Sequence, residues 1–201
     1  MTHSILQWYL PGYLLLYLLV SFVLPSLRVY KNTGINPLTF DSSDTVHDFV
    51  GLWMKVVTAL LVLVICCYSF TPQFYKYLLP FWYVTHPFIN AAGLVLIHLS
   101  LLWIVLAQYQ MRNSWRIGID EKNKTALVTN GLFQYSRNPV FAGMLASVAG
   151  IFLLLPNAFS LLCLISSYLL IQVQIRLEED FLQKQHGAIY LTYKQKVRRL
   201  L

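Results

Sequence analysis

The chain has 201 residues, of which 57% are hydrophobic and only 11% are charged. Soluble domains usually carry about a quarter charged residues, so this composition excludes an ordinary soluble fold and indicates an integral membrane protein. The formal net charge is +7. We attribute this charge to membrane topology and anionic lipid headgroups, and we expect no nucleic-acid partner.

Five apolar windows follow one another along the chain, and each has about the length that crosses a bilayer as a helix. They cover residues 8–27, 49–70, 87–108, 139–155 and 158–175. The first is too long and too aromatic for a cleaved signal peptide, so we expect it to remain as an anchor. The sequence predicts an all-α membrane bundle of about five transmembrane helices, with residues 1–201 forming a single domain.

The distribution of Lys and Arg predicts the orientation, because these residues collect on the cytoplasmic side. An external N-terminus and a cytoplasmic C-terminus place every Lys and Arg inside except Lys55 and Lys76. Lys76 is external, and Lys55 lies within the second window toward its cytoplasmic end. The compact length and the lack of a retrieval tail favour a bacterial inner membrane over the endoplasmic reticulum.

Two polar clusters flank an apolar hairpin in the C-terminal third. The first cluster ends at Arg137 and Asn138. Residues 140–175 contain no Asp, Glu, Lys, Arg or His, and the Pro156-Asn157 pair in their middle favours a turn. The second cluster starts at Arg176, and two crossings return it to the membrane face of the first. The pattern predicts a site at this boundary for a charged small molecule beside an apolar one.

Two further patterns concern packing around the hairpin. Small residues recur at helical spacing in the fourth window, which favours close helix packing. They are Gly143, Ala146, Ser147 and Gly150. After the fifth helix, apolar residues recur every four positions among Lys and Arg, which predicts a basic amphipathic helix on the membrane surface. They are Ile189, Tyr193, Val197 and Leu201.

The order of short motifs around the hairpin is similar to that of the isoprenylcysteine carboxyl methyltransferase (ICMT) family, which belongs with the membrane phospholipid methyltransferases. The first motif is Thr129-x-Gly131-x-Phe133-x-x-x-Arg137-Asn138-Pro139-x-Phe141-x-Gly143. The second is Arg176-x-Glu178-Glu179-x-x-Leu182, followed by Gly187-x-x-Tyr190-x-x-Tyr193. The resemblance covers about residue 115 to the C-terminus. It implies a supporting part, 1–110, and a cofactor-binding part, 111–201.

The resemblance implies an enzyme that binds S-adenosylmethionine from the cytoplasm and a lipid or lipid-modified acceptor from the bilayer. Methylation of an acceptor carboxylate is the favoured reaction. The implied cofactor residues are Thr125, Ala126, Leu127, Val128, Phe133, Asn138, Pro139, Val140, Phe141 and Glu178. The implied acceptor residues are Gln174 and Arg176.

The chain departs from the eukaryotic enzymes of this family at two of these positions. Those enzymes have His at the position of Asn138 and Arg at the position of Gln174. An Asn side chain still donates and accepts hydrogen bonds, so cofactor binding is compatible with the first change. The second change removes a cation that would bind an acceptor carboxylate, and Arg176 is a candidate to replace it.

The residue types also suit the chemistry of the cofactor. Arg137 is a partner for its carboxylate, Glu178 for its ribose hydroxyls, and Phe133 and Phe141 for its purine. The chain has no GxG sequence, so we expect a helical site rather than a glycine-rich loop. We predict no metal site.

Methyl transfer is an in-line displacement that depends mainly on positioning. A carboxylate acceptor needs no general base, whereas an amine acceptor must first lose a proton, for which Glu179 or Asp180 is a candidate base. The predicted catalytic residues are Arg137, Glu178 and Glu179.

Two other functions remain open from the sequence. Membrane sterol-reductase-like enzymes share a Gly-x-Phe/Tyr-x-x-x-Arg-x-Pro element and use NADPH, although their tails usually lack the Glu178-Glu179 pair. A non-catalytic transport or assembly protein is a different class. It should carry polar residues inside its helices, whereas the two C-terminal windows contain no charged residue.

Overall fold

A computed structural model of the chain describes residues 3–39, 45–120 and 122–200. Over these ranges it is all-α and contains only isolated β-bridges instead of strands, which confirms the predicted fold class. The main helices are α1 His3–Leu18, α2 Leu24–Thr33, α3 Val46–Phe70, α5 Pro87–Met111, α6 Pro139–Leu154, α7 Ala158–His186 and α8 Ala188–Lys196. The short elements are a π-helix Leu19–Val23, α4 Pro72–Tyr75 and 3₁₀ turns Lys76–Leu78, Trp82–Val84, Arg112–Ser114 and Gly131–Gln134.

Four helical segments are long and apolar enough to cross a membrane, so the protein is a multi-pass integral membrane protein. They are Ile5–Thr33, Val46–Phe70, Pro87–Ser114 and Ala158–His186. The fifth predicted span becomes α6, which has only 16 residues and a length of about 24 Å. Proline at each end explains its length, because Pro139 occupies its first position and Pro156 follows its last turn.

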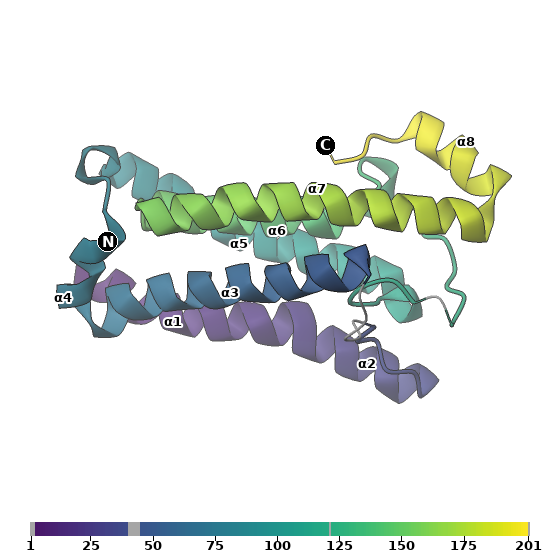
Figure 1. Cartoon of the computed structure of the whole chain (residues 1–201), viewed down its shortest axis with the longest axis horizontal. Coiled ribbons are helices and arrows are strands. Elements are labelled where there is room, and N and C mark those ends of the chain that lie inside the picture. The colour runs from purple at the N-terminus through teal and green to yellow at the C-terminus, as the bar shows by residue number, and fades with distance from the viewer. Residues whose placement is uncertain (1–2, 40–44, 121, 201) are drawn as a thin grey trace.

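The long helices lie side by side, with α1 and α3 against α5, α6 and α7 (Figure 1). The N-terminus and α4 lie at one end of the bundle, and α8 folds back over α7 at the other, which we call the α8 end (Figure 1). The turn between α6 and α7 is closed by Asn157, whose side chain accepts hydrogen bonds from the backbone of Phe159 and Ser160. The predicted hairpin and its turn are therefore confirmed.

A proline in the first span creates a link between α2 and α5. Pro25 has no N–H to donate to the carbonyl of Ser21, one helical turn earlier, and the π-helix lies at this point. The Ser21 carbonyl instead accepts a hydrogen bond of 2.7 Å from Nε2 of Gln108 on α5. Arg28 returns a bond of 2.8 Å to the Gln108 carbonyl. The first span is thereby held against α5 at the α8 end.

The small residues of α6 bring it close to α5, as the sequence predicts. A Cβ on Gly143 would lie 2.5 Å from Cγ1 of Ile104, and one on Gly150 would lie 2.5 Å from Cγ2 of Ile97. Ser147 shares a hydrogen bond of 2.8 Å with Ser100 of α5. The remaining small residue, Ala146, lies in a groove with side chains of α7.

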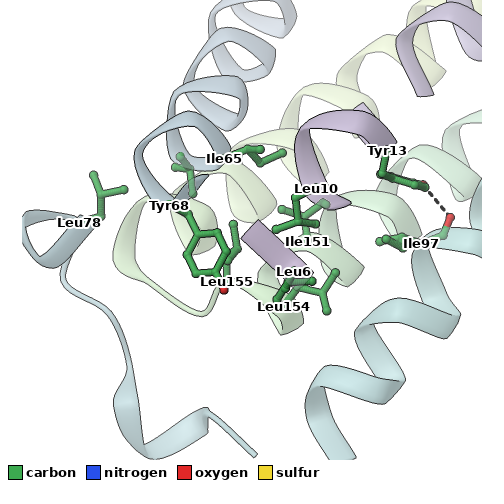
Figure 2. Packing of buried hydrophobic residues seen from close by; sticks show 11 residues of the cluster. Leu6, Leu10, Tyr13, Ile65, Tyr68, Leu78, Ile97, Ile151, Leu154 and Leu155 are labelled. Carbon is green, nitrogen blue, oxygen red and sulfur yellow. Dashed lines mark hydrogen bonds between the residues drawn. The ribbon is translucent and has the colours of Figure 1, made fainter. Parts of the chain in front are cut away.

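A hydrophobic core closes the bundle toward the end that carries α4. Figure 2 shows Leu6, Leu10 and Tyr13 of α1 packed with Ile65 and Tyr68 of α3 and with Ile97, Ile151, Leu154 and Leu155. The Tyr13 hydroxyl donates a hydrogen bond of 2.7 Å to the carbonyl of Ile97. This solid packing leaves the other half of the bundle to enclose a cavity.

Candidate functional site

A cavity of about 850 Å³ extends from the α8 end into the bundle. This volume is within the range of small-molecule sites, which is about 300–1,000 Å³. Side chains of α1, α3, α6 and α7 line it, and residues 114–120 and 125–128 of the α5–α6 connection form another wall. Tyr13, Ile65 and Ile151 line the cavity and also belong to the hydrophobic core, so the core forms its floor.

Every residue predicted to bind the cofactor lines this cavity. They are Thr125, Ala126, Leu127, Val128, Phe133, Asn138, Pro139, Val140, Phe141 and Glu178. The predicted acceptor residue Gln174 lines it too, as does Arg137. The hairpin of α6 and α7 therefore brings two motifs that are some 40 residues apart in sequence to one enclosed volume.

Gln174 and Glu178 form a polar pair on the α7 wall. They are four residues apart and so share a face of the helix. Nε2 of Gln174 donates a hydrogen bond of 3.0 Å to Oε1 of Glu178. Only 1% of the Gln174 surface is exposed, and its Oε1 has no hydrogen-bond partner among the described residues. A buried oxygen without a partner costs about 1–3 kcal/mol, so this position is suited to a ligand that donates a hydrogen bond.

Arg137 forms an ion pair with Glu179 rather than with Glu178. Nη2 of Arg137 lies 2.7 Å from Oε1 of Glu179, and Nη2 of Arg199 lies 2.8 Å from its Oε2. Glu179 is 2% exposed and does not line the cavity. Neighbouring positions on a helix face different directions, which explains why Glu178 faces the cavity and Glu179 the two arginines. The hydrogen bond to Glu179 raises the pKa of the Arg199 guanidinium above its usual value.

The other donors of Arg137 bind the C-terminal segment. Its Nη1 donates to the carbonyls of Lys194, at 3.0 Å, and Val197. Its backbone N–H donates to the Arg198 carbonyl at 2.9 Å. The side chain of Asn138 donates to the next carbonyl, that of Arg199, also at 2.9 Å. Arg137 and Asn138 thus attach the end of the chain to the start of α6.

A model of the phospholipid methyltransferase family matches residues 88–189. The chain belongs to the phospholipid methyltransferase family. This match runs from the start of α5 to the start of α8 and contains both motifs of the hairpin. It confirms the resemblance read from the sequence. No curated protein shows significant sequence similarity to the chain.

The tail of this phospholipid methyltransferase family member differs from the predicted surface helix. Ile189 is 72% exposed, whereas Tyr190 and Tyr193 are buried and line the cavity. The Tyr193 hydroxyl donates a hydrogen bond of 2.6 Å to the carbonyl of Phe133. Val197 lies beyond the helix in extended backbone. The predicted tail helix is confirmed as α8, but its predicted apolar stripe was wrong, because Tyr190 and Tyr193, at i and i+3, pack on the protein while Ile189 is exposed and Val197 lies outside the helix.

One member of that stripe, Leu201, is outside the described residues. The predicted acceptor residue Arg176 also lies away from the cavity. Its side chain is exposed and donates to Oε1 of Gln172 at 3.0 Å on its own helix.

The connection from α5 to α6 is held by contacts within itself and with α3 that the sequence did not indicate. Oδ2 of Asp120 accepts a hydrogen bond of 2.8 Å from Nε of Arg116. Nε2 of His47, in the first turn of α3, accepts one of 2.9 Å from the Ile119 backbone. His47 and Ile119 are 72 residues apart in sequence, and an Arg-Asp pair four residues apart is common on protein surfaces. Only the folded chain therefore shows that Arg116 and Asp120 line the cavity.

Proposed function

We propose that the protein is an S-adenosylmethionine-dependent methyltransferase that acts on a lipid or lipid-modified acceptor. One observation carries the proposal. The cavity that contains the polar motif residues of a methyltransferase family continues between apolar transmembrane helices. An enzyme that transfers a group from a charged cofactor to an apolar acceptor must bind both side by side, and such an enclosed volume allows this.

The polar part of the cavity fits the cofactor. S-Adenosylmethionine supplies a methyl group activated by its sulfonium. The Gln174 oxygen that lacks a partner is a hydrogen-bond acceptor for an ammonium or hydroxyl donor, and Glu178 beside it is a carboxylate for the ribose hydroxyls. Phe133 and Phe141 supply aromatic surface in the same cavity.

The apolar part of the cavity fits the acceptor. Leu14 and Leu18 of α1, Val62 of α3 and Ile171 of α7 line this part. These residues belong to membrane-spanning segments, so a hydrocarbon chain that enters from the bilayer contacts an apolar surface there.

The contacts of Glu179 favour a carboxylate acceptor over an amine. A general base must reach the proton that it removes, whereas Glu179 accepts hydrogen bonds from Arg137 and Arg199 outside the cavity lining. We therefore assign Arg137 and Glu179 as positioning residues that hold the tail and the start of α6. Methylation of a carboxylate needs only the alignment of its oxygen with the methyl group, which the cavity walls provide.

We place the α8 end, with the cofactor site, in the cytoplasm. The Lys and Arg residues of α8 and of the α5–α6 connection gather at this end, in agreement with the positive-inside bias.

Calorimetry on the detergent-purified protein tests the proposal. We expect affinity in the micromolar range, about 1–100 μM, for S-adenosylmethionine and its demethylated product, and no binding of NADPH. Glu178→Ala should abolish cofactor binding, whereas Asp180→Ala, an exposed carboxylate two residues along the same helix, should not. A wild-type protein that binds neither form of the methyl cofactor refutes the proposal. NADPH binding instead would support the sterol-reductase alternative.

Methyl-tritiated cofactor added to membrane extracts identifies the acceptor. Label should enter a lipid or lipidated fraction only when the wild-type protein is present, and methyl esters are distinguished from methylamines because alkali releases the ester label as methanol. Stable label after alkali would contradict the preference for a carboxylate.

A further inference from the structure

Three cations lie on the outside of the bundle, where α2 crosses the end of α5, and we call them the α2–α5 cation group. Arg28 and Lys31 are three residues apart and share one face of α2, and Arg112 directly follows α5. The Asn32 side chain donates a hydrogen bond of 3.2 Å to Oδ1 of Asn113, so the two segments touch at this level. None of the three cations lines the cavity.

The end of α5 holds Arg28 in place. The last carbonyls of a helix have no partner within it, and Nη2 of Arg28 donates a hydrogen bond of 2.8 Å to one of them, the Gln108 carbonyl. The Nε atom of Arg28 is buried, and its side chain as a whole is half-buried. Nη1 makes no hydrogen bond with the described residues. The protein therefore orients this guanidinium and leaves it donors for a ligand.

No acid neutralises the α2–α5 cation group within the part of the chain that the structure describes. Arg137, in contrast, pairs with Glu179 at 2.7 Å. Arg28, Lys31 and Arg112 take part in none of the ion pairs among the described residues, and neither α2 nor α5 contains Asp or Glu. Like charges repel, so an anion between these side chains stabilises their arrangement.

The level of the group in the membrane identifies the anion as part of a lipid. Arg28 lies five residues before Thr33, the end of the first span, which is about 8 Å along the helix. Tyr30 and Tyr109 are 57% and 67% exposed, and exposed tyrosines are typical of the boundary between hydrocarbon and headgroups. The phosphates of the bilayer lie at this boundary, and basic pockets between transmembrane helices bind anionic headgroups there.

The backbone at Arg112 is strained. Among the described residues other than glycine, only Leu79 and Arg112 have a positive φ, and that of Arg112 is 49°. This conformation ends α5 one turn after Gln108, whose carbonyl binds Arg28. Strain of this kind persists only where surrounding contacts maintain it, and it is concentrated at binding sites.

We propose that the α2–α5 cation group binds the phosphate of an anionic phospholipid from the leaflet at the α8 end. The planar guanidinium of Arg28 donates hydrogen bonds to the phosphate oxygens, and Lys31 and Arg112 favour a headgroup with a net negative charge. Leu24 is exposed one turn deeper on the same face of α2, where it contacts an acyl chain. This lipid is a structural ligand outside the cavity and not a methyl acceptor, so the inference does not depend on the proposed function.

Native mass spectrometry of the intact, detergent-purified protein tests this inference by counting bound lipids. The probes are dioleoyl phosphatidylglycerol, dioleoyl phosphatidylcholine and dioleoylglycerol, which share their acyl chains and carry an anionic phosphodiester, a zwitterionic one and none. We expect the first phosphatidylglycerol to bind about tenfold more tightly than phosphatidylcholine, as charged hydrogen bonds at a half-buried site allow. Phosphatidylcholine should in turn bind more tightly than dioleoylglycerol. Displacement of the lipid by millimolar inorganic phosphate would show a site for a free anion and overturn the lipid assignment.

Three variants isolate the contribution of the cations. Arg28→Gln should remove the advantage of both phospholipids over dioleoylglycerol. Lys31→Gln combined with Arg112→Gln should remove only the advantage of phosphatidylglycerol over phosphatidylcholine, and both of these side chains are exposed, so the protein should stay folded. Lys184→Gln combined with Lys196→Gln is the matched control, because these exposed cations of α7 and α8 lie at the same end and their loss changes the net charge equally. It should keep the wild-type preferences.

Retention of the wild-type preferences in the Lys31, Arg112 variant overturns the inference, even if Arg28→Gln fails to fold. An equal loss in the Lys184, Lys196 variant also overturns it, because that result shows a general effect of surface charge. Gel filtration establishes that each variant is folded. The demethylated cofactor product should bind equally to the wild type and to the Lys31, Arg112 variant, because the cation group lies outside the cavity. Loss of that affinity in the variant overturns the assignment of a separate lipid site.

Discussion

Replacement of Glu179 by methionine tests whether the ion pairs around it hold the C-terminal segment in place. The carboxylate of Glu179 binds Arg137 and Arg199 at 2.7 and 2.8 Å. Met has a similar length and removes the charge without leaving a large space. The variant removes the acid from two guanidiniums and from the Lys194 ammonium, which lies 3.8 Å from Oε2, so the ion pairs between α7 and the C-terminal segment are lost.

The burial of the two arginines predicts how much each ion pair with Glu179 contributes to the free energy of unfolding. The side chains of Arg137 and Glu179 are 8% and 3% exposed, and loss of one partner from such a buried pair costs about 3–5 kcal/mol. The Arg199 side chain is 35% exposed, where an ion pair contributes about 0–1 kcal/mol. Glu179→Met should therefore lower the free energy of unfolding by about 3–5 kcal/mol, and Arg199→Met by about 1 kcal/mol or less.

Unfolding of the purified variants in mixed micelles measures these differences, and calorimetry with the cofactor product measures the site. The double variant Arg137→Met, Glu179→Met should cost less than the sum of its two single changes, because it leaves no buried charge alone. Equal losses for Arg199→Met and Glu179→Met would refute the argument from burial. Retained stability with abolished turnover in Glu179→Met would instead show a direct catalytic role.

Two further changes test the packing and the cover of the cavity. Gly150→Ala should destabilise by about 1–3 kcal/mol through contact with α5, whereas Gly12→Ala, with open space at its Cβ, should not; thermal unfolding compares them. Burial alone would raise the pKa of Asp120, but hydrogen bonds, mainly from Arg116, hold that pKa below its usual 3.8. Asp120 therefore stabilises the connection fully above pH 3.8, and this effect is lost as the pH falls through the lowered pKa. The protection of residues 115–120 from hydrogen exchange should fall over this pH range in the wild type but not in Asp120→Asn. The same pH dependence in both proteins would contradict this assignment.

The sequence was sufficient for the hairpin and for most residues of the site. The absence of charge over 140–175 and the Pro156-Asn157 turn require two adjacent apolar helices, and such helices return Glu178 to the membrane face of Arg137. The motif residues therefore had to meet at one end of the bundle. Their roles at the site remain predictions, which the variants above test.

The sequence was not sufficient for details that depend on direction and on remote contacts. It could not decide which of Glu178 and Glu179 faces Arg137, since a rotation of 100° about α7 exchanges them. It assigned the wrong face to α8, because the burial of Tyr190 depends on the surface that α7 and the loop before α6 offer.

The sequence by itself determined a membrane-embedded helical protein and the end of the bundle at which its polar motifs collect. Hydrophobic length and the positions of Pro, Gly and charge are local properties, and the bilayer converts them directly into spans and turns. Only the tertiary structure decided that Lys55, from a different helix, shares the cavity with Glu178, and that Glu179 joins the C-terminal segment to α7. Those relations depend on the rotation and approach of helices, which side-chain packing across the whole bundle sets.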